Sequence, residues 1–463
     1  MHIPNDAALL SAEQISARLD RMPATRTVWK LVILLSLGYF FEFYDLLYTA
    51  YVAPGLVKSG ILTATTPGLF GSTGVASFVA ALFAGLFIGT SLSGFLADRY
   101  GRRVMFTGSL LWYVIANAVM AFQDTASGLN IWRLVAGIGI GAELVVIGSY
   151  LTELVPKQLR GRAFACGQAV GFVAVPTAAY LAYLLVPLKP FGLDGWRWLV
   201  LIGCHGAVFV WWIRRALPES PRWLAGQGRL VEADQVLSEI ERRVQIDYGR
   251  ELPVPMPVQK IEQSGKFSDL WQAPYRGRTV LMIVFNVFQT IGYYGFASWV
   301  PTLLIRQGIT ITTSLEYSSL IALAAPVGPL LGLLIADRFE RKYVIIATSL
   351  IILIAGLLFS QVTDLVSVIS LGVCLTLASN ILSYSYHAYQ AELFPTAIRS
   401  RAVSFVYSWG RFVAIFNAFM IAAALKIGGV TGVFLFIGCA MLIVAVVIYW
   451  FGPRTKNLAV EAI

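Results

Sequence analysis

Apolar runs of about 20 residues recur along this chain of 463 residues. A run of that length can cross the hydrocarbon core of a bilayer as a helix. The backbone must satisfy its own hydrogen bonds in that medium, and the runs lack the alternation of membrane-barrel strands, so each is predicted to be helical. The predicted spans are 31–52, 75–97, 104–123, 130–152, 163–187, 196–213, 279–303, 317–337, 343–361, 366–391, 400–424 and 430–451.

The composition agrees with an all-α membrane protein. Apolar residues make up 57% of the chain and charged residues only 13%, against roughly a quarter in soluble proteins. The net charge of +10 comes from lysines and arginines in the connections between apolar runs, which is typical of membrane topology and not of nucleic-acid binding. With the N-terminus inside, 28 of the 35 lysines and arginines fall in cytoplasmic segments. We therefore expect a multi-pass bacterial inner-membrane protein with both termini in the cytoplasm.

One long polar connection divides the predicted spans into two sets of six. It contains a helical candidate at 230–244, followed by a proline-rich piece. We predict an N-terminal six-helix bundle at 1–213, a cytoplasmic linker with short helices at 214–276, and a C-terminal six-helix bundle at 277–463.

Two charged motifs recur with one fixed offset, which indicates an internal repeat. Asp98 and Asp337 lie 239 residues apart, and so do Glu153 and Glu392. Basic residues follow each acid in both copies. Because the two matches share one register, we infer two homologous halves, an arrangement common among transporters.

These motifs carry a resemblance to a known family. The run 94–103, Gly-Phe-Leu-Ala-Asp-Arg-Tyr-Gly-Arg-Arg, resembles the loop 2–3 signature of the major facilitator superfamily. Arg133 with Gly137, Gly139 and Gly141, and the run 218–224, Pro-Glu-Ser-Pro-Arg-Trp-Leu, are similar to motifs of its sugar-porter branch. The resemblance implies twelve helices in two pseudo-symmetric six-helix bundles, secondary transport by alternating access, and a monomer.

Other segments resemble a different part of the superfamily. The run 141–146, Gly-Ala-Glu-Leu-Val-Val, is similar to a stretch in organic-acid and metabolite:proton symporters, including nicotinate-type transporters. The run 293–295, Tyr-Tyr-Gly, points the same way. Sugar porters carry a Gly-Pro plus Trp signature in the tenth helix, and 383–389 lacks it here.

Charged residues within the predicted spans are the first candidates for function, because an ionisable group at bilayer depth is costly and usually faces a cavity and a partner. Glu42 and Asp45 lie three residues apart in the first span and share one helical face. By resemblance to proton-coupled sugar porters, Asp45 is the proton carrier and Arg133 its switch partner, with Glu42 close by. The alternative is a permanent ion pair that joins the first and fourth helices.

Arg411 and Glu143 are the candidates that bear on the substrate. A guanidinium stays charged and its planar fork fits a carboxylate, so Arg411 in the eleventh span is predicted to bind a substrate carboxylate. The alternative is a resident ion pair with Glu143 or Glu42. Glu143 is expected near the middle of the fourth span, as a second proton site, a substrate contact or the partner of Arg411.

Weaker candidates for the substrate cavity are polar residues on single helix faces. Gln168 matches a ligand-contacting glutamine of sugar porters. Such residues also form ordinary interhelical hydrogen bonds. The other candidates are Asn286, Gln289 and Tyr293 in the seventh span and Asn380, Tyr384 and His387 in the tenth.

The charged residues of the cytoplasmic loops are predicted, by resemblance, to form a salt-bridge network that holds the inside gate closed. Positive-inside topology alone is the alternative. The first half contributes Asp98, Arg102, Arg103, Glu153, Arg160, Arg162 and Glu219, and the second half Asp337, Arg341, Glu392, Arg399 and Arg401.

Together these features favour proton-coupled symport of a small organic anion, a monocarboxylate or an aromatic acid. A sugar or polyol symporter, an organic-cation carrier and a non-transporting membrane sensor stay open as alternatives. No nucleophile–base motif or phosphate-binding loop is present, so neither an enzyme nor an ATP-driven pump is expected. We expect no cofactor and no metal; the partners are the substrate, protons and the lipid bilayer.

Overall fold

The computed structural model describes residues 11–63, 65–71, 73–206, 217–255, 267–336 and 339–455. Within these ranges the chain is helical and contains no β-strand, only an isolated bridge between Pro67 and Thr73. Asp337 lies outside the described residues.

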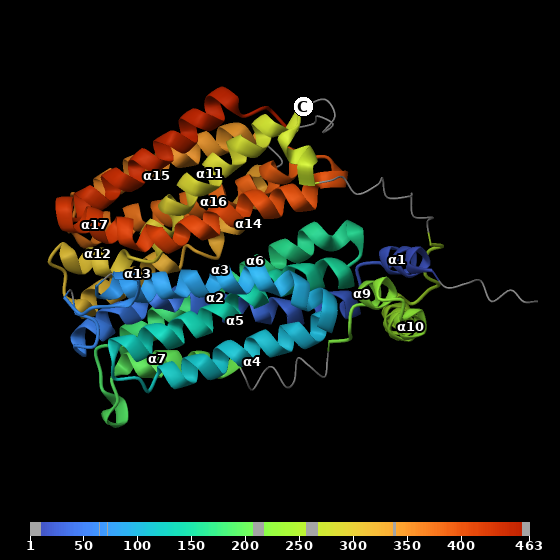
Figure 1. The fold of residues 1–463 in the computed structure, drawn as a ribbon, viewed down its shortest axis with the longest axis horizontal. Helices are drawn as coiled ribbons and strands as arrows, with labels where there is room; N and C mark the ends of the chain where they lie inside the picture. The colour runs from blue at the N-terminus through green and yellow to red at the C-terminus, as the bar shows by residue number, and fades with distance from the viewer. Residues whose placement is uncertain are drawn as a thin grey trace, which may run out of the picture.

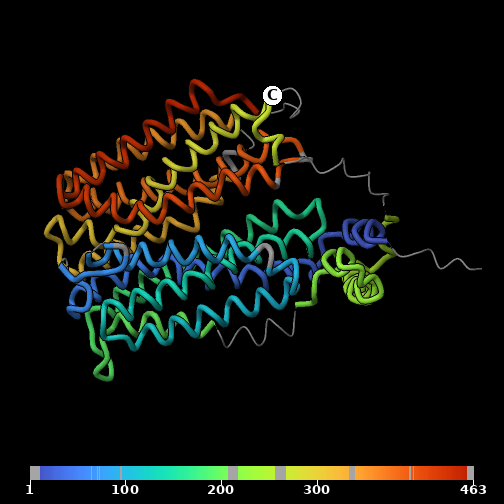
Figure 2. The backbone as a smooth tube through the Cα atoms, viewed as in Figure 1, coloured from blue at the N-terminus to red at the C-terminus, as the bar shows by residue number. Residues whose placement is uncertain are grey.

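The helices form two groups and a small cluster at one end. Figure 1 shows α2–α7 side by side in one group, α11–α17 in the other, and α1, α9 and α10 together beyond the end of the first group; the same path is followed in Figure 2. In the first group and the end cluster, the bounds are α1 Ala12–Asp20, α2 Arg26–Lys58, α3 Val75–Tyr100, α4 Arg102–Met120, α5 Ala126–Leu154, α6 Arg160–Leu185, α7 Gly195–Gly203, α9 Pro221–Gly226 and α10 Leu230–Tyr248. The second group comprises α11 Tyr275–Ala297, α12 Val300–Arg306, α13 Ile311–Ala322, α14 Val327–Ala336, α15 Arg341–Phe359, α16 Leu365–Glu392 and α17 Thr396–Phe451.

Ten segments of the described chain are long and apolar enough to cross a membrane. The last segment, Arg401–Phe451, covers the last two predicted spans. These are two helices joined within α17, which is interrupted at Gly429, where a φ of 61° is not helical. The sixth predicted span begins as α7, and its remainder lies outside the described residues. The domain boundaries at 213 and 277 stay a prediction.

Two predicted spans are each divided into two helices in the structure. The seventh, 279–303, is α11 and then α12, separated at Ser298 and Trp299. The eighth, 317–337, is α13 and then α14, with the break at Leu323–Pro326. Pro301 and Pro326 explain both breaks, since proline lacks an N–H and its ring disfavours helical backbone before it.

Backbone-to-backbone packing of α3 on α5 fixes the position of the charged residues on α5. A Cβ added at Gly89 would lie 2.1 Å from the carbonyl oxygen of Ile138, and one at Gly141 would lie 2.4 Å from that of Leu86. Small residues spaced four apart along a membrane helix let the backbones of two helices approach this closely. The glycines of the fourth-span motif therefore have a packing role.

Ion pairs hold the end cluster together. Arg18 on α1 bonds Asp234 at 2.5 Å and Glu241 at 2.6 Å, both on α10, and Arg21 bonds the same Glu241 at 2.7 Å. Asp247 near the end of α10 accepts hydrogen bonds of 2.7 Å from the main-chain N–H and the hydroxyl of Thr27. The predicted helix at 230–244 is thus confirmed as α10, tied to α1 and to the start of α2.

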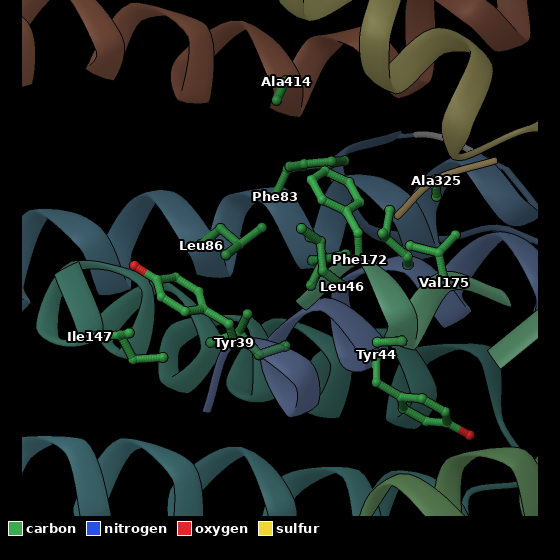
Figure 3. Close-up of a cluster of buried hydrophobic side chains, with 14 of the residues drawn as sticks. Tyr39, Tyr44, Leu46, Phe83, Leu86, Ile147, Phe172, Val175, Ala325 and Ala414 are labelled. Carbon is green, nitrogen blue, oxygen red and sulfur yellow. The ribbon is translucent and has the colours of Figure 1, made fainter. Parts of the chain in front are cut away.

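Aromatic contacts join the two groups of helices. The Phe83 ring on α3 packs 4.7 Å from that of Tyr294 on α11, and the Phe87 ring lies 5.9 Å from that of Phe412 on α17. Figure 3 shows side chains near this boundary, among them Phe83 and Phe172 from the first group and Ala325 and Ala414 from the second.

Candidate functional site

A cavity of about 110 Å³ lies between the two groups of helices. Its walls come from α2, α5 and α6 on one side and from α11, α16 and α17 on the other. Seven of the lining residues are phenylalanines or tyrosines, and Glu42, His387 and Arg411 bring ionisable groups. The lining residues are Tyr39, Glu42, Phe43, Leu46, Leu47, Leu144, Gln168, Phe172, Gln289, Thr290, Tyr293, Tyr294, Ser383, Tyr386, His387, Tyr407, Gly410 and Arg411.

Arg411 is the one arginine or lysine among the described residues that line this cavity. Its side chain is 8% exposed, with one Nη donating 2.6 Å to the hydroxyl of Tyr294 and the other donating to that of Tyr407. Its Nε has no hydrogen-bond partner among the described residues. Neither of the ion pairs expected as the alternative, with Glu143 or with Glu42, is formed. The two tyrosines orient a guanidinium that makes no salt bridge to a carboxylate of the described residues.

Glu42 reaches the same cavity from α2, opposite Arg411. The residue is fully buried, and neither carboxylate oxygen has a hydrogen-bond partner in the described part of the chain. The structure therefore brings two predicted site residues to one cavity from the two halves of the molecule.

Asp45 and Arg133, which the resemblance pairs as proton carrier and switch partner, lie together, but not as the direct ion pair that was the alternative. Arg133 donates to the main-chain oxygen of Asp45 at 2.7 Å, to the Tyr48 hydroxyl at 2.7 Å and to the Thr49 hydroxyl. The carboxylate of Asp45 instead accepts a 2.8 Å hydrogen bond from the side-chain amide of Asn117. Both residues are buried inside the N-terminal group, and neither lines the cavity.

Glu143 lies deep within the N-terminal group. It is fully buried and does not line the cavity, although its neighbour Leu144 does. Neither of its carboxylate oxygens, nor the hydroxyl of Tyr113, has a hydrogen-bond partner in the described ranges. Its predicted contact with substrate has no support in this arrangement.

The weaker candidates divide between the cavity and the helix packing. Gln168, Gln289, Tyr293 and His387 line the cavity.

The other three candidates do not line it. Asn286 donates to the main-chain oxygen of Met282 at 2.8 Å, and the ring of Tyr384 packs against Gly332. Asn380 donates 3.1 Å to the main-chain oxygen of Ala325 and lines a second, smaller cavity of about 50 Å³. Leu47, Phe172 and Tyr293 form walls of both cavities.

Several lining residues were not among the sequence candidates. Tyr407 precedes Arg411 by four residues, so helical spacing could have revealed it.

The geometry also assigns the tautomer of His387. Its Nδ1 lies 2.6 Å from the carbonyl oxygen of Ser383, which can only accept, so Nδ1 carries a proton. In the neutral ring, Nε2 then accepts from the Tyr386 hydroxyl at 3.2 Å.

The loop charges form equivalent ion pairs in the two halves. Arg102 pairs with Glu153 at 2.9 Å, and Arg341 pairs with Glu392 at 2.7 Å, at the same offset of 239 residues. Asp98 adds a second bond to Arg102, at 2.8 Å.

The remaining loop residues have separate surroundings. Glu219 accepts 3.1 Å hydrogen bonds from the main-chain N–H groups of Arg102 and Arg103. Arg399 donates 3.0 Å to the main-chain oxygen of Phe394. Arg160 is half-buried, whereas Arg162 and Arg401 are exposed. Each contact named here joins residues of one half, and whether the set acts as a gate stays a prediction.

Comparisons with known proteins place the chain in a family. A family profile described as "Sugar (and other) transporter" matches residues 31–463. The chain is 33% identical to the putative metabolite transport protein YyaJ of Bacillus subtilis over 95% of both chains. It is 27% identical to the niacin transporter NiaP of Acinetobacter baylyi, over 96% of this chain and 99% of that one.

Solved structures show the same fold. The xylose transporter XylE from E. coli, in a partially occluded inward-open conformation, matches with a TM-score of 0.73 and 19% identity, over 93% of this chain and 99% of that one. The matched family and relatives are transporters, not enzymes. The chain belongs to the sugar (and other) transporter family.

Proposed function

We propose that this transporter carries a small organic anion, an aromatic acid or another monocarboxylate, together with protons, by alternating access. The observation that carries the proposal is Arg411 in the cavity between the two groups of helices. Two tyrosine hydroxyls orient its fork, which makes no salt bridge to a carboxylate in the described part of the chain. A guanidinium in that setting is suited to a bidentate carboxylate.

The rest of the cavity supports a flat, partly apolar anion. Tyrosine and phenylalanine rings supply large apolar faces, while Gln168 and Gln289 provide neutral hydrogen-bonding groups. A relative of 27% identity is named a niacin transporter, and niacin is an aromatic monocarboxylic acid.

Sugar transport is the second candidate, because another relative, 26% identical over 83% of this chain, is the arabinose-proton symporter of Bacillus subtilis. A neutral sugar leaves the charge of Arg411 without a counter-ion, which makes this candidate weaker. An organic cation fits less well still. Of the three buried carboxylates in α2 and α5, only Glu42 lines the cavity, opposite a fixed positive charge.

Proton coupling is assigned to α2, where Glu42 and Asp45 lie one helical turn apart. We also place the protein in a bacterial inner membrane as a monomer with both termini in the cytoplasm, in agreement with the bias of lysines and arginines and with an inner-membrane relative.

The test is uptake into proteoliposomes under an imposed inward proton gradient. The labelled probes are nicotinate, benzoate, xylose and a quaternary ammonium ion, each with wild type and Arg411→Ala. We expect gradient-driven uptake of a carboxylate by wild type and its loss in the variant, with Arg306→Ala as an exposed control. Uptake of xylose or of the cation alone by the folded wild type would contradict the proposal.

A further inference from the structure

Glu42 and Arg411 have complementary charges, face one cavity, and come from opposite halves of the transporter. Glu42 lies on α2 and Arg411 on α17. They form no ion pair here: Arg411 donates to Tyr294 and Tyr407, and both oxygens of Glu42 lack a hydrogen-bond partner in the described chain.

A buried carboxylate without any donor is stable only in its neutral form. An ionised carboxylate out of water costs several kcal/mol unless a cation or hydrogen-bond donors compensate it. An arrangement without an ion pair between Glu42 and Arg411 is the one expected when Glu42 holds a proton. When Glu42 is ionised, the guanidinium across the cavity is the nearby group able to compensate its charge.

The other two buried carboxylates of the described membrane-spanning helices have different surroundings. Asp45 has an amide donor in Asn117 and the guanidinium of Arg133 bound to its own main chain, so its ionised form is compensated locally. Glu143 has no donor, but it does not line the cavity. Of these three described carboxylates, Glu42 alone combines the lack of a hydrogen-bond partner with a place at the cavity opposite Arg411.

We propose that Glu42 is the proton-coupling residue, and that its carboxylate and the substrate carboxylate bind Arg411 in alternation. This inference rests on the proposed function of Arg411. On the uptake side, a proton from water binds Glu42 and releases Arg411, and the substrate anion takes its place. On the other side the substrate leaves, the proton returns to water, and the ionised Glu42 pairs with Arg411 again.

The exchange sets the stoichiometry. One proton and one monovalent anion enter together, so the cavity has the same net charge in its loaded and its empty form. A proton alone leaves Arg411 as an uncompensated cation, and an anion alone puts two carboxylates beside one guanidinium; both states are unfavourable in a closed site. We therefore expect electroneutral symport with one proton per monocarboxylate.

Other ionisable groups near Glu42 have to be separated from it in any pH experiment. Those that interact with it, line its cavity or lie one turn away on the same helix are Tyr39 and Asp45 on α2, Tyr113 on α4, Glu143 on α5, Tyr293 and Tyr294 on α11, Tyr386 and His387 on α16, and Tyr407 and Arg411 on α17. Tyrosines stay neutral across the physiological range, which leaves His387, Glu143 and Asp45 as the rivals.

The first test is the pH dependence of nicotinate and benzoate binding to purified protein by titration calorimetry. Because binding requires protonated Glu42, the dissociation constant of wild type should rise with pH, approaching about tenfold per pH unit on the alkaline side. In Glu42→Gln, a neutral isostere of the protonated form, affinity should stay at its acidic value throughout. Asp45→Asn, Glu143→Gln and His387→Gln should each retain the pH dependence if they fold.

The second test is transport in proteoliposomes. Glu42→Gln should exchange labelled for unlabelled nicotinate but lose accumulation driven by a proton gradient, and wild-type uptake should not respond to an imposed membrane potential. Persistent pH dependence or gradient-driven accumulation in Glu42→Gln overturns this inference and leaves the proposed function intact. Absence of carboxylate binding by folded wild type overturns the proposed function, and this inference with it.

Discussion

Arg133 donates a 2.7 Å hydrogen bond to the main-chain carbonyl oxygen of Asp45, while the carboxylate of Asp45 binds Asn117. The arginine thus joins α5 to α2 through the backbone and through the hydroxyls of Tyr48 and Thr49. The guanidinium carbon of Arg133 also lies 4.7 Å from the ring centre of Tyr48 and 5.3 Å from that of Phe78, and these contacts complete its burial. This geometry is that of a structural clamp on the first span.

Arg133→Lys should therefore destabilise the protein, although it keeps the charge. A single ammonium cannot reproduce the fork that reaches three acceptors, so we expect a loss of about 2–3 kcal/mol in unfolding free energy. The measurement is thermal unfolding in detergent, with Arg306→Lys on the exposed side of α12 as control. Equal melting temperatures of the two variants would show that the clamp contributes nothing.

The packing of α3 on α5 gives a matched pair of glycine substitutions on one helix. Gly141→Ala places a methyl group 2.4 Å from a backbone oxygen that cannot yield, whereas a Cβ at Gly148 meets nothing within 4 Å. We expect Gly141→Ala to lower stability by about 1–3 kcal/mol. Gly148→Ala should leave stability unchanged or raise it by up to about 1 kcal/mol. Thermal unfolding would show the difference, and similar values for both would refute the close approach.

Tyr294→Phe removes a hydroxyl that orients Arg411 without removing the ring. Losing one hydrogen bond of about 1 to 1.5 kcal/mol should weaken carboxylate binding by about five- to tenfold. Titration calorimetry with nicotinate measures it, and Tyr449→Phe, an exposed tyrosine on α17, is the control. Unchanged affinity would mean that the Tyr294 hydroxyl does not position the guanidinium.

The contact between α10 and α2 should depend on pH. The hydroxyl and main-chain N–H of Thr27 donate to Asp247 and hold the pKa of this carboxyl below its usual value of 3.8. A carboxyl whose pKa is lower in the folded than in the unfolded protein stabilises the folded state at pH values above the unfolded pKa. That stabilisation is lost as the pH falls through the pKa of the folded state.

The protection factors of the α10 amides, which relate the observed exchange rate to the intrinsic rate at the same pH, should accordingly fall below about pH 4. Asp247→Asn should show fast exchange already at neutral pH, and the exposed Glu251→Gln should behave as wild type. Acid-independent protection of α10 in wild type would contradict the assignment.

The sequence allowed most of the fold to be predicted, because a bilayer imposes length and apolarity on every span. The repeat offset of 239 also predicted equivalent loop residues, and Arg102–Glu153 and Arg341–Glu392 do form equivalent pairs. The breaks at Pro301 and Pro326 were missed, since prolines are tolerated within membrane helices and only packing decides whether the chain turns there.

The candidate site was predicted in part. Arg411, Glu42, Gln289 and Tyr293 reach the cavity because charge and polarity at bilayer depth point inward. Partner choice could not be read from the sequence: Arg133 selects hydroxyls and a carbonyl oxygen over the carboxylate of Asp45, which depends on sub-ångström placement of α2 against α5. Asn286 and Tyr384 share helix faces with lining residues, yet they pack against their own or neighbouring helices.

The central claim is that Arg411 recognises a carboxylate, and a matched pair of ligands tests it most directly. Nicotinate and nicotinamide share a ring and differ in charge at one substituent, so titration calorimetry of both against wild type, Arg411→Ala and Arg306→Ala isolates that group. We predict binding of nicotinate but not nicotinamide to wild type and to Arg306→Ala, and loss of nicotinate binding in Arg411→Ala. Equal affinity of wild type for both ligands, or nicotinate binding that survives in Arg411→Ala, would contradict the account.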